Sequence, residues 1–302
     1  ARLPALHLES FSDTLKCFSE TEKTLGYLGD KIFATGLWNE TAGEKHKWFK
    51  YQPSFPESPS TAILSSPMIG SANPMYQCAD QVCLTHRAFT NIDLENVGED
   101  FIQRCKYVPE SSMDEYLKLF PETGWGTSYA NEYRIICRRR LDNEGANTLI
   151  ASIIPPGVAH VDTIFGIAIN DDSFPVVGAM MMSIVYDFFV RTLRKSDFLT
   201  NTMVTLPYLP DCPQKNELIH RALLLSCVTK WYSPLWEKYY DSTWEKDKWS
   251  KNDIRLKNDA FSRGVVWNNL VPLRSEYSRR QAQVEIDVLT AMALGMTLEQ
   301  LT

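Results

Sequence analysis

The chain has 302 residues, of which 44% are hydrophobic, 12% aromatic and 23% charged. This composition is typical of a globular protein with a buried core and excludes a disordered chain, because segments that stay solvated contain few aromatic residues. The formal net charge of −6 does not by itself indicate a nucleic-acid-binding protein, since phosphate contacts come from clustered lysines and arginines. The length accommodates two ordinary domains or one large one.

The cysteine content and the hydropathy of the sequence predict the cellular compartment of the protein. The cysteines are odd in number and widely spaced, at positions 17, 78, 83, 105, 137, 212 and 227, which fits free thiols in a reducing cytoplasm better than a disulfide framework. No run of about 18 apolar residues occurs, and no signal peptide precedes Leu3. We therefore expect a cytoplasmic protein that neither enters a membrane nor is exported.

The two ends of the sequence predict a fragment. The chain begins with Ala1 in place of a methionine, and it stops while a helical pattern over 297–301 is beginning. We expect a longer parent protein, with a processed complete protein as the alternative.

The first 120 residues are predicted to change from helix to strands. Residues 5–37 carry apolar side chains three and four positions apart, which is typical of a helix. Five prolines between positions 51 and 74 predict a connector and the best domain boundary. From 63 to 109, short apolar runs broken by turn residues predict strands, and 111–120 predicts a short capped helix.

The middle of the chain predicts three strands and a long helix. The apolar runs over 133–140, 148–154 and 163–169 have the length and composition of strands, and a Pro-Pro-Gly sequence ends the second. Residues 176–193 are apolar enough for one buried helix, and 203–210 predict an extended segment.

Beyond position 213 the pattern is mainly helical. Helices are predicted over 217–236, with an interruption at Ser233-Pro234, and over 275–294, where Gly295 provides the C-terminal cap. The sequence thus predicts an α+β fold. Its three parts are a helical N-terminal connector, a small mixed β-sheet domain with flanking helices and a largely helical region, over 1–60, 61–212 and 213–302.

Three short motifs have chemistry of their own. Asn73-Pro74-Met75-Tyr76 is similar to the Asn-Pro-Pro-aromatic loop that holds a flipped base in amino-methyltransferases, but methionine replaces the second proline, and we expect a structural turn. Cys78, Cys83 and His86 lack a fourth partner at zinc-site spacing, and we expect ordinary thiols. Pro210-Asp211 lacks the acidic and lysine partners of a metal-dependent nuclease.

Basic residues form two groups along the middle of the chain. They are Arg134 with Arg138, Arg139 and Arg140, and Arg191 with Arg194 and Lys195. In a strand, Arg138 and Arg140 point to one face and Arg139 to the other. One face is then suited to phosphates and guanine edges while Arg139 pairs with an acid. The alternative is a solvated edge strand protected by its charge, and the local chemistry leaves both open.

His160 follows the Pro-Pro-Gly sequence that ends the second predicted strand. Its imidazole is able to hydrogen-bond a phosphate or a base, and it serves equally well as a histidine satisfied within its own loop. The five histidines are scattered at 7, 46, 86, 160 and 220, which makes an acid–base network hard to build.

Several stretches together carry a family resemblance. Residues 133–169 and 176–210 resemble the target-recognition region of type II restriction–modification enzymes and related class I adenine methyltransferases. They share an arginine-rich strand, a Thr-Leu-Ile … Ile-Pro strand pair, a helix with an apolar-aromatic motif and a closing Leu-Pro-x-x-Pro segment. ILSSPMIGSANPMY at 63–76 and the helical stretch at 272–301 are also similar to that family. The resemblance extends from about Arg2 to Leu301.

The resemblance implies a bacterial parent enzyme, active in defence against phage, that methylates an adenine amino group with S-adenosylmethionine in a separate upstream domain. This chain would hold no cofactor, no metal and no catalytic residue of its own. Its partners would be double-stranded DNA and the methyltransferase domain, with no membrane. The side chains expected at the DNA are Arg134, Arg138, Arg140, His160, Arg191, Arg194, Lys195 and Asn201.

Two other functions stay open. A protein-interaction module would dock a catalytic subunit through the last helix and the tryptophans at 231, 236, 244, 249 and 267, without binding DNA. A self-contained enzyme would depend on the 73–76 tetrapeptide. Binding of DNA distinguishes the recognition function from the docking module, and binding of S-adenosylmethionine identifies the self-contained enzyme.

Overall fold

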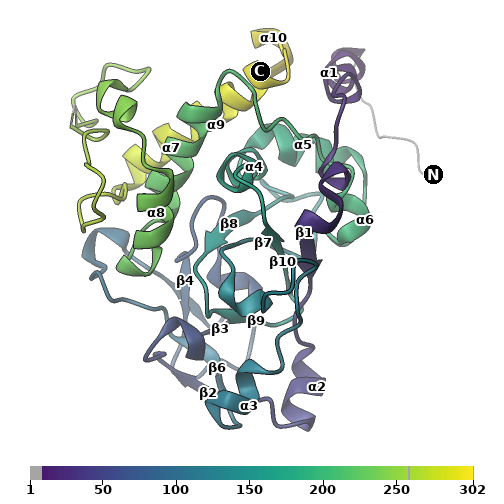
Figure 1. Cartoon of the computed structure of the whole chain (residues 1–302), viewed down its shortest axis with the longest axis vertical. Coiled ribbons are helices and arrows are strands. Elements are labelled where there is room, and N and C mark those ends of the chain that lie inside the picture. Colours follow the sequence, from purple (N-terminus) through teal and green to yellow (C-terminus); the bar gives the residue numbers. More distant parts are fainter. Residues whose placement is uncertain (1–8, 258, 302) are drawn as a thin grey trace.

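The computed structural model describes residues 9–257 and 259–301, and it has the predicted α+β fold. Strands occupy the middle and one end of the molecule, and the C-terminal helices lie together beside them (Figure 1). The N-terminal helix α1 (Glu9–Ser19) contacts the C-terminal helix α10 (Leu298–Leu301). The part of the predicted N-terminal helix at residues 5–8, with Leu8, lies outside the described residues.

The main sheet has four strands in the order β1-β10-β7-β8. Their bounds are Ile32–Thr35 for β1, Ile164–Ile169 for β10, Arg134–Arg138 for β7 and Ala151–Ile154 for β8. All three pairings are antiparallel, with Ile167 opposite Ile135 and Ile135 opposite Ile153. Every residue of β8 and β10 is buried, which explains why these strands read as continuous apolar runs. The three strands predicted in the middle of the chain are confirmed.

The first strand of this sheet corrects the prediction of one helix over 5–37. Helix α1 ends at Ser19, a short 3-10 helix covers Leu25–Lys31, and β1 follows. Ile32 pairs with Ile169 and Thr35 with Gly166. The edge of β10 gives these residues backbone partners that their helical spacing does not reveal, so the tertiary pairing decides the local structure.

Three two-stranded sheets lie beside the main sheet. β2 (Phe49–Ser54) pairs with β6 (Cys105–Pro109), and β4 (Gln77–Ala79) with β5 (Phe89–Asn91), both antiparallel. β3 (Ile63–Leu64) pairs with β9 (Ala159–His160) and is the parallel pair of the described chain. The strands predicted over 63–109 are confirmed. Parallel and antiparallel pairs both occur, but in separate sheets.

Two short helices pack around β2 and β6. Helix α2 (Glu40–Lys45) starts at Asn39, whose side chain accepts a hydrogen bond from the Ala42 amide. Helix α3 (Met113–Leu117) starts at Ser112, whose hydroxyl accepts from the Glu115 amide. The capped helix predicted over 111–120 is therefore confirmed, with its cap at the expected serine.

The long helix predicted over 176–193 is broken into α4 (Phe174–Met181) and α5 (Ile184–Thr192), bent by 69°. The Ser183 hydroxyl accepts from the Tyr186 amide and caps α5, which is the position that serine favours over a helix interior. In the described part of the chain no single helix is long and apolar enough to cross a membrane; α4 and α5 reach that length and apolarity only as this bent pair.

Helices also form the last third of the described chain. Helix α6 (Thr200–Met203) precedes it, and the last third contains α7 (Lys215–Ser226), α8 (Ser233–Tyr239) and α9 (Glu276–Ala293). The helix predicted over 217–236 ends earlier than expected, at Ser226, and Ser233-Pro234 starts α8 instead of interrupting it, because proline is accommodated in a first turn. Gly295, with φ of +70°, follows the end of α9 as predicted.

One core joins the segments predicted as separate parts. A continuous cluster of buried apolar side chains runs from Phe18 through β7, β8 and α4 to Leu294. Trp236, Trp244 and Trp267 are buried in it, and the two remaining tryptophans of the docking hypothesis pack against it. This corrects the part of that hypothesis that depends on the tryptophans, since these side chains pack in the chain's own core.

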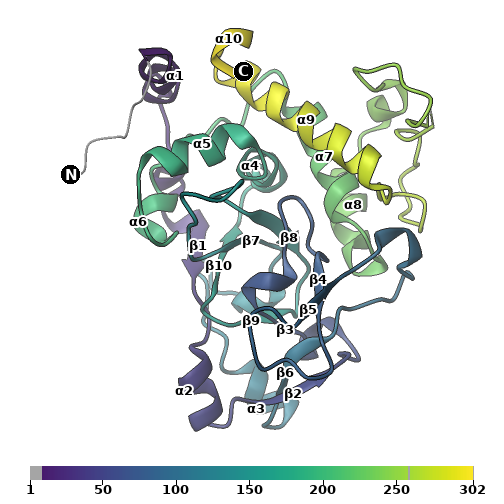
Figure 2. The same ribbon diagram turned by 180° about the vertical axis from the view of Figure 1, so that it is seen from behind.

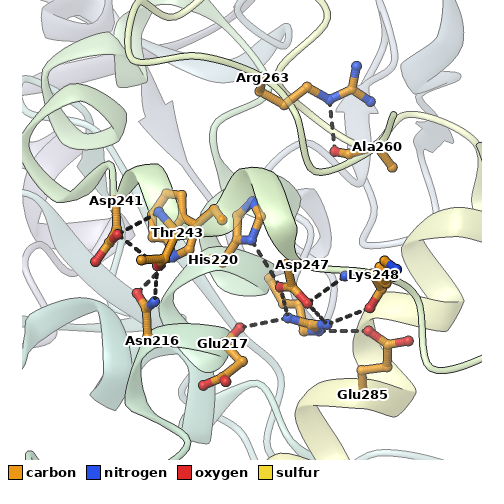
Figure 3. Close-up of polar contacts among 12 residues, drawn as sticks. Asn216, Glu217, His220, Asp241, Thr243, Asp247, Lys248, Ala260, Arg263 and Glu285 are labelled. Atoms are coloured by element: carbon orange, nitrogen blue, oxygen red, sulfur yellow. Dashed lines mark hydrogen bonds and ion pairs between the residues drawn. The ribbon is translucent and has the colours of Figure 1, made fainter. Parts of the chain in front are cut away.

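A buried charge network fixes the segment between α8 and α9. Asp247 accepts 2.7 Å and 3.2 Å hydrogen bonds from two Arg221 nitrogens and a 3.3 Å bond from His220 Nδ1. Arg221 Nε donates at 2.7 Å to Glu285 of α9. Figure 3 shows Asp247 between His220 and Glu285. The His220 ring stacks on Trp244 at 4.3 Å, so the network ties the 241–260 segment to α7 and α9.

Replacing Asp247 with asparagine is expected to lower the free energy of unfolding by about 3 kcal/mol. The substitution leaves the buried Arg221 guanidinium with one fewer anionic partner, and breaking a buried pair in this way typically costs about 3–5 kcal/mol. Urea unfolding followed by circular dichroism measures the change. Asp211→Asn, which breaks an exposed pair with Lys215, is the matched control and should cost less than about 0.5 kcal/mol. Equal stability of the two variants contradicts the assignment.

Candidate nucleic-acid interface

Two of the predicted DNA-contacting residues are fully buried. Arg134 donates from Nη2 to the Pro155 carbonyl at 2.9 Å and from Nε to the Glu132 carbonyl at 3.1 Å, and its guanidinium lies 4.8 Å from the Tyr129 ring centre. His160 Nε2 is 3.0 Å from the Tyr129 hydroxyl. Burial, together with the charge of Arg134, lowers the pKa of His160 to about 3. This corrects the sequence-based assignment, because both side chains are enclosed by the protein and bonded to its own groups, with Arg134 Nη1 left without a partner among the described residues.

The arginines at the end of β7 do not divide into a DNA-facing pair and Arg139 as predicted, because Arg138 is bound to the backbone of the protein and Arg140 shares Asp197 with Arg139. Arg139 pairs with Asp162 at 3.1 Å and with Asp197 at 3.5 Å, which confirms that it meets acids. Arg138 is half-buried and donates from Nε and Nη2 to the Ile69 carbonyl at 3.1 Å and 2.6 Å. Arg140 is 81% exposed and has a single weak pair, at 3.6 Å, with Asp197.

The structure brings Arg140, the last residue of the first basic group, beside the second basic group. The Leu141 amide donates to the Ser196 carbonyl at 3.0 Å, and the backbones of Arg140 and Asp197 pair in an isolated antiparallel β-bridge. Arg191 donates to the carbonyls of residues 145 and 146 at 3.0 Å and 3.1 Å. The loops 140–147 and 191–197 are thus side by side. We call their four basic residues, Arg140, Arg191, Arg194 and Lys195, the basic ridge.

The basic ridge is exposed at most of its positions. Arg194 and Lys195 are exposed, and within the described residues they make no ion pair. Arg194 adopts φ of +49°, a left-handed conformation that turns the chain sharply after α5. Asn201, the remaining predicted contact, is exposed on α6. Arg140, Arg191, Arg194, Lys195 and Asn201 therefore remain candidates for the interface.

A cleft of about 670 Å³ begins beside the ridge. Its walls come from the 70–76 turn, residues 91–95, residues 146–150, the start of α5 and the N-terminal half of α9. Figure 2 shows α9, α4, α5 and β8 together on this side of the molecule. We call it the α9 cleft. Ala146 and Asn147 line it and belong to the loop that contacts Arg191, so ridge and cleft are continuous.

Arg279 fixes the wall of the α9 cleft. This buried side chain donates to the carbonyls of Leu225, Leu273 and Ala72 at 3.0 Å, 2.9 Å and 2.6 Å. Burial and the neighbouring Arg274 lower its pKa to about 9, so it stays charged at neutral pH. Gln283, one turn later, donates to the Ser71 carbonyl at 2.8 Å. The 70–76 turn is thereby bound to α9.

The Asn73-Pro74-Met75-Tyr76 tetrapeptide is a turn, as predicted, but it lines the cleft. The Asn73 side chain accepts from the Met75 amide at 3.0 Å, and the Gly70 amide donates to the Asn73 carbonyl at 2.9 Å. Ala72 has φ of +51°, a conformation that is uncommon for residues other than glycine and that clusters at functional sites. The sequence predicted the turn and did not predict the cleft that Asn73 and Tyr76 line.

The other sequence motifs do not assemble into a site. Within residues 9–257 and 259–301, no three His, Cys, Asp or Glu side chains lie together as metal ligands. Cys78, Cys83 and the other cysteines are free thiols. Asp211 is exposed and pairs with Lys215 at 3.5 Å.

Comparison with known proteins adds no assignment. No protein family model matches the chain. No curated protein matches it either.

Replacing Arg279 with methionine is expected to destabilise the protein by about 3 kcal/mol, because three buried carbonyl groups lose their donors at once and each unsatisfied group costs about 1–3 kcal/mol. The loss is reduced by removal of a buried charge. Urea unfolding measures it. Arg280→Met, at the neighbouring exposed position, is the control and should change stability by less than about 0.5 kcal/mol. A small effect at position 279 would show that the turn does not depend on this arginine.

Asp287 predicts a pH-dependent stability. It accepts from the Ile184 amide at 2.7 Å, and burial raises the pKa of its carboxyl to about 6 from 3.8. Because the folded-state pKa is raised, the contribution of Asp287 to stability is complete below about pH 4 and is lost as pH rises through 6. Asp287→Asn should therefore raise the free energy of unfolding at pH 7.5 by about 2 kcal/mol and leave it unchanged near pH 4. Denaturant unfolding at both pH values tests this, and a gain that is equal at the two refutes it.

Proposed function

We propose that this chain recognises the DNA target sequence for an adenine-N6 DNA methyltransferase or restriction–modification enzyme. The observation that carries the proposal is that Arg140 lies beside Arg191, Arg194 and Lys195, about 50 residues away in sequence, in a ridge next to a polar cleft. The resemblance of residues 133–210 and 272–301 to target-recognition regions supports the same reading. Under this proposal the protein acts in the bacterial cytoplasm.

The ridge fits the phosphate backbone and the cleft fits base edges. Exposed arginine and lysine side chains neutralise phosphates and fix the register of a protein on the duplex, while amide and carboxylate side chains distinguish bases. Amides and carboxylates are plentiful in the α9 cleft. Under this proposal the four basic side chains of the ridge supply the phosphate contacts of a protein whose net charge is −6.

Catalysis is assigned to a separate methyltransferase domain in the same chain or complex. That domain would bind S-adenosylmethionine and receive the target adenine, and this chain would position the duplex for it. The alternative function is a docking module for the catalytic subunit that does not contact DNA. It is favoured by an exposed apolar stripe on α9, formed by Val284, Val288 and Met292.

Substitution of Arg140, Arg194 and Lys195 by alanine tests the proposal. The triple variant should bind a fluorescent duplex at least about tenfold more weakly at low salt, and the slope of log K against log salt should fall by about 3. Fluorescence anisotropy measures both quantities.

A charge-matched variant is the control for this experiment. Lys50, Lys118 and Lys246 are exposed on β2, after α3 and before Asp247, away from the ridge. Their joint replacement by alanine should leave DNA affinity within about twofold of the wild type. Absence of any DNA association by the wild-type protein at low salt, with tight binding to a methyltransferase subunit, would favour the docking function instead.

A further inference from the structure

We infer that the protein binds one small monovalent anion, such as chloride, between the Arg134 guanidinium and the Tyr116 hydroxyl. Arg134 is the first residue of β7, and Tyr116 belongs to helix α3, at the end of the molecule away from helices α7 and α9 (Figure 1). This site goes beyond the proposed DNA-binding function. Three observations carry it: a buried positive charge without an acidic partner, two buried donors without acceptors, and neighbouring polar groups that are already paired.

The charge of Arg134 is not neutralised by an acid. Its Nε and Nη2 donate to the carbonyls of Glu132 and Pro155, which are uncharged groups. The Glu132 carboxylate accepts instead from Trp125 Nε1 at 3.0 Å, and no carboxylate among the described residues forms an ion pair with Arg134. Burial lowers the pKa of Arg134, but a guanidinium stays protonated in proteins. Because an isolated buried charge is costly, such a group is normally paired with a counter-charge.

Two buried donors in this part of the fold have no partner. Arg134 Nη1 and the Tyr116 hydroxyl make no hydrogen bond with the residues that the structure describes, and both side chains are 0% exposed. An unsatisfied buried donor is destabilising, and in a native protein it indicates a bound water or ion. A guanidinium nitrogen only donates, so the missing partner of Arg134 has to be an acceptor.

Tyr116 and Arg134 are close enough to interact electrostatically. Burial raises the pKa of Tyr116 well above its usual value, and the positive charge of Arg134 opposes that rise. The Arg134 guanidinium lies 4.8 Å from the Tyr129 ring centre, and Tyr116 and Tyr129 belong to one buried cluster. The Tyr116 ring is held by Trp38 and Phe120, at 5.1 Å and 5.7 Å between ring centres. One bridging acceptor would satisfy both donors.

The neighbouring polar groups favour an anion over a water molecule. His160 Nδ1 donates to the Val161 carbonyl at 3.3 Å, and Nε2 accepts from the Tyr129 hydroxyl at 3.0 Å. Gly166 permits this pairing, because an added Cβ there would overlap the Tyr129 hydroxyl oxygen. A water that accepted from both unpaired donors would need acceptors for its own two protons, and these neighbours are already in use. An anion only accepts, and its charge compensates that of Arg134.

Thermal unfolding in two sodium salts tests the inference. An anion that binds the folded and not the unfolded protein raises the melting temperature as its concentration increases, whereas gluconate is too large for an enclosed site. At equal ionic strength the wild type should melt about 2–4 °C higher in chloride than in gluconate, the shift for an ion at about ten times its dissociation constant. Bromide should replace chloride, because its charge is the same and its size is similar. Circular dichroism measures the three melting temperatures.

Variants of buried tyrosines separate this site from general salt effects. Tyr116→Phe keeps the ring and removes one donor, and it should reduce the chloride shift to less than about half. The matched control is Tyr232→Phe, which removes another buried hydroxyl, one that donates to the Ile153 carbonyl at 3.0 Å. The control should lose stability in both salts and keep the full chloride shift. Arg134→Met should abolish the shift, because the charge that attracts the anion is gone.

Crystals grown with sodium bromide locate the ion directly. Anomalous scattering should give a peak within hydrogen-bond distance of Arg134 Nη1 and the Tyr116 hydroxyl oxygen. Equal melting of the wild type in chloride and gluconate overturns the inference. A chloride shift that Tyr116→Phe leaves intact also overturns it, as does an ordered water without anomalous signal at this position. These measurements use no nucleic acid, so their outcome is independent of the proposed DNA-binding function.

Discussion

The arrangement of the molecule depends on one buried cation. Arg279 extends from α9 to carbonyl groups on three separate segments: the 70–76 turn, α7 and the chain just before α9. A planar guanidinium is the side chain that supplies several donors in fixed directions at once. Because carbonyls and not a carboxylate surround it, Arg279 holds the sheet part and the helical part together without neutralising its own charge. The turn that carries Tyr76 is positioned by this contact.

Local sequence patterns were sufficient for most of the secondary structure. The isoleucine-rich runs at β7, β8 and β10 are buried on both faces, so they read directly as strands. Helix α9 has its serine cap at Ser275 and its glycine after the last turn, and both are visible in sequence. The break between α4 and α5 was missed because hydropathy is continuous across it, and the capping by Ser183 is a matter of three-dimensional packing.

The candidate interface was predictable only in part, because the sequence does not show which basic residues are buried. Arginine is usually exposed, so a run of arginines in the sequence suggests a surface, yet Arg134 is enclosed by the carbonyls of Pro155 and Glu132. Nothing local indicates those partners, of which Pro155 is 21 residues away. The proximity of the 140–147 and 191–197 loops is likewise a tertiary property. The residue types were therefore predictable, and their assembly into a ridge and a cleft was not.

In the loop between β7 and β8, the groups that fix the backbone are separate from the side chains that are exposed. Its backbone is anchored by Asp142, which accepts from the amides of Glu144 and Gly145, and by Asp187, which accepts from those of Thr148 and Leu149. The side chains at 144, 146 and 147 are exposed and hold none of these bonds. Substitutions there cost little folding free energy, typically within about 0.5 kcal/mol. New side chains can accumulate beside the cleft while the scaffold stays constant, which is the property that allows one fold to diversify its specificity.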